Sequence, residues 1–162
     1  KIQKLTRLVD DAVQTTRRII NDLRPSILDN LGVWAAIEWL AHDVAGRANL
    51  ECQVIQDESV AELELSAAKS TALFRIVQES LSNVWRHANA TNVTVHSYID
   101  GDHIVVEIAD DGKGLLASDL AKVGHWGVMG MHERAKSHGG EVSVASTVGH
   151  GTTVRVRLPL GE

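Results

Sequence analysis

Hydrophobic positions in the first part of the chain recur at helical spacing. Alternating steps of three and four residues separate the mostly apolar positions from Ile2 to Leu23. This heptad pattern is typical of a coiled-coil or bundle helix, which needs a partner to cover its apolar seam. Pro25 predicts the end of that helix. A second amphipathic stretch, from Leu28 to about Gly46, predicts another helix.

The rest of the chain alternates between strand-like and helical patterns. Leu50–Gln56 predicts a strand, and Ser66 is suited to cap a helix that runs to about Asn89. A later helix is expected near Gly130–Ser137. Apolar residues at every second position predict four more strands, within residues 93–99, 104–108, 142–144 and 154–158. This alternation predicts an antiparallel or mixed sheet in a two-layer α/β sandwich, with helices on one face.

Composition limits the classes of function. A chain of 162 residues fits one domain, or one domain with an appendage. The net charge of −5 and the pI of about 5.9 argue against general nucleic-acid binding. Cys52, the single cysteine, excludes an internal disulfide and a cysteine-based zinc cluster, so we expect a reducing, cytoplasmic location. No apolar run approaches the roughly 20 residues that cross a bilayer. Because the sequence starts at Lys1 within a helical pattern, we interpret it as part of a longer protein.

Glu79 and Asn83 are four residues apart on the predicted long helix, so they lie on one face, and Arg86 and His87 continue that face. Mg²⁺ prefers oxygen ligands, commonly one or two from the protein with the rest from phosphates and water. Asn83 can supply a neutral oxygen, and Glu79 can orient or deprotonate a nucleophile or a metal-bound water. Taken alone, this spacing also fits the polar face of a surface helix.

Several glycine-rich segments follow the strands. Asp110 ends a predicted strand and opens a turn that contains Gly112 and Gly114. A carboxylate only accepts hydrogen bonds, so it would favour the amine of adenine over the carbonyl of guanine. Asp-Gly is also a common turn pair, so this turn could be a plain connection.

Two further segments could contact phosphates or the base. Gly127-Val128-Met129-Gly130-Met131 precedes the predicted helix, whose free N–H groups would favour phosphate. Its glycines, with Gly124, predict a mobile loop that closes over a nucleotide. Gly149-His150-Gly151-Thr152 forms a turn before the last strand, where the Thr152 hydroxyl could reach the base or a water. A surface loop and an ordinary hairpin are the simpler alternatives.

Read in order, these segments resemble the catalytic ATP-binding domain of sensor histidine kinases, a Bergerat-type ATPase fold. Glu79–Ala88 resembles the family's N box, Asp110–Gly114 its G1 box, and Gly127–Arg134 its G2 region. The resemblance implies ATP and Mg²⁺ as ligands, with Asn83 on the metal and Glu79 as the catalytic base or the partner of a metal-bound water. It also implies nucleotide contacts, from Asn83, Arg86, His87, Asp110, Gly112, Gly114, Gly127, Gly130, Met131, Gly151 and Thr152.

A narrower resemblance, to the NarX/DesK-like subfamily, rests on Leu23-Arg24-Pro25, Trp39-Leu40-Ala41 and Gly130-Met131-His132-Glu133-Arg134. It implies a second dimerisation helix with linker over residues 1–31 and an ATP-binding domain over residues 32–162. It also implies homodimerisation in the full-length protein, which could be membrane-anchored. The expected partner is a response regulator, usually with a helix-turn-helix output domain.

In this family a histidine accepts the phosphoryl group from ATP, and this histidine is missing from its expected place. The heptad helix contains no histidine, and His42-Asp43 follows the Leu-Arg-Pro segment instead of preceding it. We therefore expect the acceptor to lie outside this chain. An anti-sigma-type serine kinase and a non-catalytic nucleotide-sensing module are the alternative interpretations.

Overall fold

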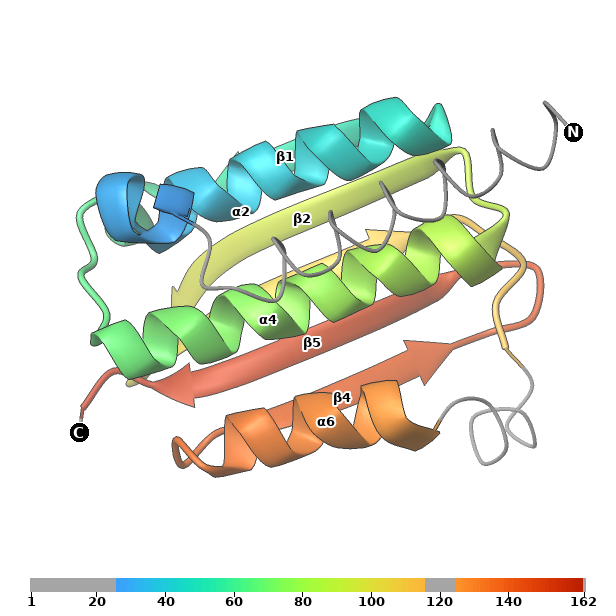
Figure 1. Ribbon diagram of the computed structural model, residues 1–162. Helices are drawn as coiled ribbons and strands as arrows, with labels where there is room; N and C mark the ends of the chain where they lie inside the picture. Colours follow the sequence, from blue (N-terminus) through green and yellow to red (C-terminus); the bar gives the residue numbers. More distant parts are fainter. Residues whose placement is uncertain (1–25, 116–124, 162) are drawn as a thin grey trace, which may run out of the picture.

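The computed structural model describes residues 26–115 and 125–161, which form a five-stranded sheet with helices on one face (Figure 1). The spatial order of the strands is β1-β2-β3-β5-β4, with β1 parallel to β2 and the other neighbours antiparallel. The strands are β1 (Glu51–Gln56), β2 (Asn92–Asp100), β3 (His103–Asp110), β4 (Glu141–Ser146) and β5 (Thr152–Pro159). The predicted two-layer sandwich with a mixed, mainly antiparallel sheet is confirmed.

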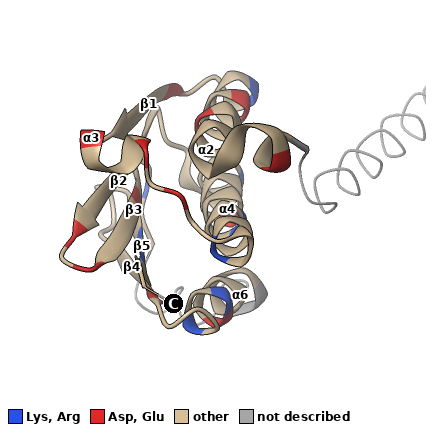
Figure 2. Ribbon diagram, turned by 90° about the vertical axis from the view of Figure 1, so that its left-hand side faces the viewer, with Lys and Arg blue, Asp and Glu red and all other residues tan. Residues whose placement is uncertain are grey.

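Three long helices form the second layer and lie along the same side of the sheet (Figure 2). They are α2 (Ser26–Ala48), α4 (Ala67–Asn83) and α6 (His125–Lys136). The predicted N-cap at Ser66 is confirmed, because its hydroxyl accepts a hydrogen bond from the Lys69 N–H at 3.3 Å. A π-helical turn, η1 (Val84–Ala88), extends α4 and ends at Asn89, which has a left-handed φ of 51°.

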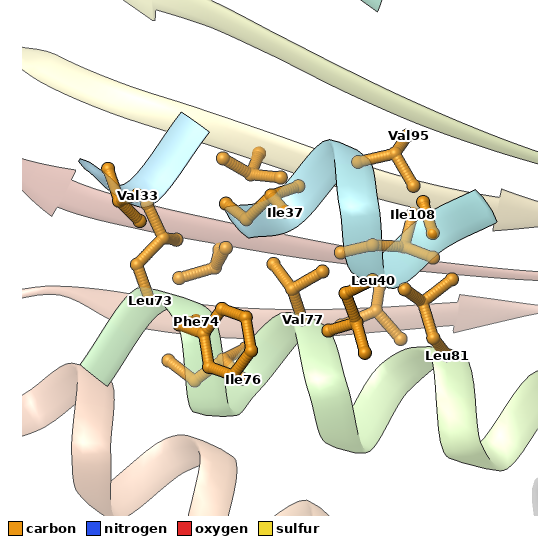
Figure 3. Close-up of a cluster of buried hydrophobic side chains, with 14 of the residues drawn as sticks. Val33, Ile37, Leu40, Leu73, Phe74, Ile76, Val77, Leu81, Val95 and Ile108 are labelled. Atoms are coloured by element: carbon orange, nitrogen blue, oxygen red, sulfur yellow. The ribbon is translucent and has the colours of Figure 1, made fainter. Parts of the chain in front are cut away.

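The core lies between these helices and the sheet (Figure 3). Val33, Ile37 and Leu40 of α2 meet a row of apolar side chains on α4, with Phe74 and Val77 among them. Val95 and Ile108 contribute from β2 and β3. Val33, Ile37 and Leu40 lie in the predicted amphipathic stretch, and Val95 and Ile108 lie on the strand faces that the period of two predicts to be buried. Because these side chains fix which face of α4 is buried, they also fix the direction of its other side chains, which include those of the candidate site.

On the opposite face of the sheet, the described residues form charged pairs rather than a second layer of helices. Arg155 lies 3.2 Å from Glu107 and donates a hydrogen bond to the Tyr98 hydroxyl at 3.0 Å. Arg157 lies 3.3 Å from Glu141 and 3.5 Å from Asp100. Val105, beneath these side chains, is fully buried. The long stems of the arginines can therefore shield apolar surface while their charges remain paired.

Some elements differ from the sequence-based expectation. A short helix, α3 (Glu58–Ala61), was not predicted, and it buries Val60. α6 begins at His125, several residues before the expected start near Gly130. The heptad helix and Gly124 lie outside the described residues. Within residues 26–115 and 125–161, none of the helices has the length and apolar character needed to cross a membrane.

The boundary predicted between residues 31 and 32 falls inside α2. Gly32 interrupts this helix with φ 81° and ψ 173°, so the backbone changes direction there. Leu28, before the break, is nevertheless buried with Val33 and Ile37 in the same core. The short segment from Ser26 to Leu31 therefore packs on the domain that follows it.

Candidate nucleotide-binding site

A cavity of about 280 Å³ lies where η1, the end of β3, the start of β5 and the first turns of α6 meet. Most of the residues predicted from the sequence line it, from four separate segments. These are Glu79, Asn83, Arg86, His87, Asp110, Gly114, Gly127, Met131 and Thr152. The structure thus brings the predicted carboxylate, carboxamide and glycine turns together around one space.

The cavity also has an apolar wall that sequence reasoning missed. The apolar residues that contribute to it are Val84, Ala88, Ile108, Leu115, Val128, Val144 and Val154. The sequence signal was available for Ile108 and Val154, because their strand periodicity already placed them on the covered face. Mostly apolar walls with a few polar groups are usual for small-molecule sites.

The end of α4 presents the polar side of the cavity. Glu79 and Asn83 lie one helical turn apart, and the π-helical turn from Val84 to Ala88 follows at once. A π-helical turn contains one residue more than an α-helical turn, and such turns often mark functional sites. Val84 and Ala88 are buried, whereas Arg86 and His87 are exposed at the cavity's edge. This arrangement places two cationic or hydrogen-bonding side chains beside Asn83.

Asp110 ends β3 with its side chain on the covered face of the sheet. Its Oδ1 accepts a hydrogen bond from the Gly112 N–H at 2.8 Å, and the Thr152 N–H also bonds to the carboxylate. Burial raises the pKa of the Asp110 carboxyl, while these two backbone bonds act in the opposite direction. A carboxylate offers about four lone pairs, so it can still accept from a bound molecule.

Gly112 and Gly151 have a role other than lining the cavity. An added Cβ at Gly112 would come closer than 3.0 Å to the carbonyl of Ala88, and one at Gly151 would do the same to the carbonyl of Asp110. These glycines allow the Asp110–Gly114 turn to pack, backbone against backbone, on η1 and on the last turn. They therefore set the position of Asp110 without contacting the cavity.

Ser146 was not predicted, and it ties two of the turns together. Its hydroxyl accepts a hydrogen bond from the Leu115 N–H at 2.8 Å and lies 2.9 Å from the Thr152 hydroxyl. It also donates to the Gly151 carbonyl at 3.1 Å. A polar residue at a covered position, after Val142 and Val144 in the same alternation, was the sequence signal that could have revealed it.

The predicted loop is wrong for residues 127–129, because the whole segment from Gly127 to Met131 belongs to α6. Met131 and Ala135 are fully buried against the core, and Met131 Sδ lies 3.4 Å from the Ser80 hydroxyl. This burial outweighs the helix-weakening effect of two glycines, which is about 1 kcal/mol each relative to alanine. Gly130 does not line the cavity, and nothing in the described residues tests a mobile lid.

Asp111 lies beside Asp110, but its side chain contacts a different element. Its carboxylate accepts hydrogen bonds from the backbone N–H groups of Thr91 and Asn92 at 2.8 and 2.9 Å. The Thr91 hydroxyl and the Asn92 amide donate to its other oxygen, each at 2.7 Å. The bonds from Asn92, followed by those from Thr91, hold the pKa of Asp111 well below its usual range. Asp111 thus joins the site loop to the start of β2, although its charge also raises the pKa of Asp110.

Replacing Asp111 by Ala should lower the free energy of unfolding by about 1–2 kcal/mol at neutral pH. This loss of unfolding free energy is smaller than four buried hydrogen bonds would give, because the Asp111 carboxylate is exposed and water competes for its hydrogen bonds. The folded-state pKa is lowered, so the stabilisation exists above the unfolded pKa of about 3.9 and is lost as the pH falls below it. Urea unfolding at pH 7 and pH 3 should show the difference between wild type and variant shrinking at the lower pH. An equal difference at both values would contradict this account.

The cavity offers oxygen atoms of the kind that Mg²⁺ prefers. Among the described residues, no group of three or more His, Cys, Asp or Glu side chains could hold a metal by itself. Glu79 and Asn83 line the cavity together and offer oxygen atoms, which is the ligand type that Mg²⁺ prefers. The residues present therefore fit an ion that takes most of its ligands from phosphates and water, with Asn83 as its contact with the protein.

Comparison with known proteins agrees with this geometry. The family model described as histidine kinase-, DNA gyrase B- and HSP90-like ATPase matches residues 68–162, which hold the candidate site. UhpB of Salmonella typhimurium, a signal transduction histidine-protein kinase/phosphatase, is 36% identical over 161 residues, which are 98% of this chain and 30% of UhpB. The sensor histidine kinase LiaS of Bacillus subtilis is 32% identical over 99% of this chain and 43% of its own. The chain thus spans less than half the length of these relatives.

Solved structures support the fold. The histidine kinase domain of the blue-light activated kinase EL346 from Erythrobacter litoralis superposes with a TM-score of 0.68 at 21% identity, covering 79% of this chain and 61% of that one. The Acinetobacter baumannii kinase AdeS gives a TM-score of 0.66 at 15% identity, covering 98% and 85%. Since the family model matches more than half of the chain, and does so around the site, the chain belongs to the histidine kinase-, DNA gyrase B- and HSP90-like ATPase family.

Proposed function

We propose that this chain is the ATP-binding catalytic part of a two-component sensor histidine kinase. The observation that carries the proposal is the shared cavity, into which α4 brings Glu79 and Asn83 while β3 brings Asp110. Sensor kinases among the relatives, at 36% and 32% identity, support the same reading. The Leu-Arg-Pro segment and the Gly130–Arg134 motif favour the NarX/DesK-like subfamily within this class.

Each polar residue has a part in the proposed reaction. Asp110 accepts from the exocyclic amine of adenine, and the apolar wall around Ile108 and Val154 packs on the ring. At the edge of the cavity, Arg86 neutralises charge on the phosphates and His87 donates a hydrogen bond to them. Gly114 and Thr152 complete the wall near Asp110. Phosphoryl transfer depends mainly on positioning and charge stabilisation, which these groups supply.

In the transfer step, a nitrogen of the acceptor imidazole forms a bond to the γ-phosphorus. The bond from that phosphorus to the β–γ bridging oxygen breaks, and ADP leaves with the electron pair. The proton on the other imidazole nitrogen passes to Glu79, the carboxylate next to Asn83 on α4. Mg²⁺, when bound through Asn83, supplies positive charge against the phosphates. The phosphoryl group then passes to an aspartate of a response regulator.

The wider arrangement is also part of the proposal. Residues 1–31 form the second dimerisation helix and its linker, and residues 32–162 form the ATP-binding domain. The full-length protein is a homodimer with its kinase part in the cytoplasm. The partner is a response regulator with a helix-turn-helix output domain, as is usual in the subfamily that the sequence resembles.

Transfer to a supplied helix tests this function. Incubated with γ-labelled ATP and Mg²⁺, the chain alone should stay unlabelled, because its heptad segment contains no histidine. Adding a dimerisation helix that carries the acceptor histidine should give acid-labile label on that helix. Omitting Mg²⁺, or replacing Asn83 by Ala, should abolish the label.

Other outcomes separate the alternatives. Label on His42 of the isolated chain would show that the acceptor lies within it. Nucleotide binding without any transfer would favour a non-catalytic sensing module. Acid-stable label on a serine of an added substrate would favour an anti-sigma-type serine kinase.

A further inference from the structure

Gly127 lies in the first turn of α6, at the place where this helix meets the polar end of α4. Met131 and Ala135 are fully buried and fix the face of α6 that points to the core. Residue 127 is four positions before Met131, so it lies on that same face. The side chain at this position is therefore directed toward α4 and the cavity, whatever residue occupies it.

The space that a side chain at residue 127 would need is already filled by Glu79. A Cβ there would come closer than 3.0 Å to Glu79 Oε1, and would lie 3.1 Å from its Cδ and 3.7 Å from its Cγ. The three nearest atoms all belong to this one side chain. Neither the α4 backbone nor any other residue is among them. An added methyl group would therefore press first on the Glu79 carboxylate, which is the flexible end of a side chain.

Gly130, in the same helix, provides a contrast. A Cβ there would meet only the guanidinium of Arg134, at 2.9 Å from Nη1 and 3.9 Å from Cζ. This is the far end of a long and exposed side chain, which can move aside. Gly46, in α2, has nothing within 4 Å of its added Cβ. Gly127, Gly130 and Gly46 therefore differ in what an added methyl group would touch.

We propose that Gly127 is a positioning residue, whose missing side chain reserves the space in which the Glu79 carboxylate lies. The inference rests on the proposed role of Glu79 as the base and adds a requirement on the first turn of α6. Phosphoryl transfer depends on the placement of the base, so a shift of this carboxylate slows the reaction while the nucleotide contacts at Asp110 remain.

A double-mutant cycle tests the proposal. The quantity measured is the rate at which the γ-phosphoryl group of ATP is transferred to the supplied acceptor helix. Gly127→Ala should lower this rate at saturating ATP by about 10²-fold, the cost of a displacement of roughly 1 Å. The affinity for ATP should change by less than about threefold, a small effect beside that loss. The thermal midpoint should stay the same or rise, because alanine favours helix more than glycine does. Gly46→Ala, the matched helical control, should leave rate and affinity unchanged.

The second arm places Gly127→Ala in a Glu79→Ala background. If residue 127 acts only through the carboxylate, the substitution should cause no further loss there. If the loss of rate in the double variant equals the product of the losses in the two single variants, the proposal is overturned. So would a Gly127→Ala chain that loses ATP affinity or thermal stability in parallel with its rate.

A readout that needs no activity separates this inference from the proposed function. The carboxyl ¹³C resonance of Glu79, assigned by its disappearance in Glu79→Gln, should shift in Gly127→Ala and stay in place in Gly130→Ala. If the unmodified chain transfers no phosphoryl group to the supplied acceptor helix, the kinase proposal fails, and this measurement still tests whether Gly127 sets the position of the Glu79 carboxylate. An unshifted Glu79 resonance in Gly127→Ala would overturn it.

Discussion

Replacing Asp110 by Asn should weaken ATP binding by about 1–3 kcal/mol and reduce the preference for adenine over guanine. The carboxylate accepts from Gly112 at 2.8 Å and faces the cavity with acceptor capacity to spare. In wild type, a guanine carbonyl would leave two acceptors facing one another, which should favour ATP over GTP by about 10²-fold or more. Asparagine can keep an oxygen toward Gly112 and turn an NH₂ group toward the base. This donor suits guanine, so the preference should shrink or reverse.

Calorimetric titration with ATP and GTP measures both effects. The matched control is Asp111→Asn, which removes the neighbouring charge from a side chain that bonds to Thr91 and Asn92 outside the cavity. This variant should bind ATP with almost unchanged affinity. Equal affinity of the wild type for ATP and GTP would show that Asp110 does not read the base. A similar loss in both variants would show that charge alone explains the effect.

The sheet could be predicted because its strands bury one face. Apolar residues such as Val93, Val95 and Ile108 alternate with polar neighbours because only one face of the sheet is buried. The structure confirms that these three residues are buried. The parallel pairing of β1 with β2 was beyond the sequence, because both patterns fit either direction. The start of α6 was mistaken since local glycine content favours a loop, whereas the burial of Met131 is a tertiary effect.

The candidate site could also be predicted only in part from the sequence. The order of Glu79, Asn83 and Asp110 along the chain was enough to predict that they act together, and they line one cavity. The sequence could not distinguish the glycines that border the cavity from those that permit backbone contact, because the difference depends on segments far apart in the chain. The π-helical turn has no sequence signal of its own. It arises where the end of α4 must place Val84 and Ala88 inward, with Arg86 and His87 outward.

The largest loss of stability is expected for Gly151→Ala. Gly151 is buried at φ 84°, a conformation that costs an alanine about 1–2 kcal/mol. Its added methyl group would also come closer than 3.0 Å to the Asp110 carbonyl oxygen and would touch the Asp111 Cα. These are backbone atoms at the end of β3, so relief requires the strand and the last turn to separate. Overpacking of this kind costs a further 1–3 kcal/mol or so, for a total of about 2–5 kcal/mol.

Gly149→Ala is the control that separates strain from crowding. Gly149 has a similar φ of 76° in the same turn, but nothing lies within 4 Å of its added Cβ. Its substitution should therefore cost only the conformational part, about 1–2 kcal/mol. Urea unfolding of the two variants measures the difference, which is the cost of pushing the last turn away from Asp110. Because that movement displaces the residue proposed to read adenine, Gly151→Ala should also lose ATP affinity, whereas Gly149→Ala should retain most of it. Equal destabilisation by the two substitutions would mean that the turn is not held against the end of β3, and that Asp110 owes its position to something else.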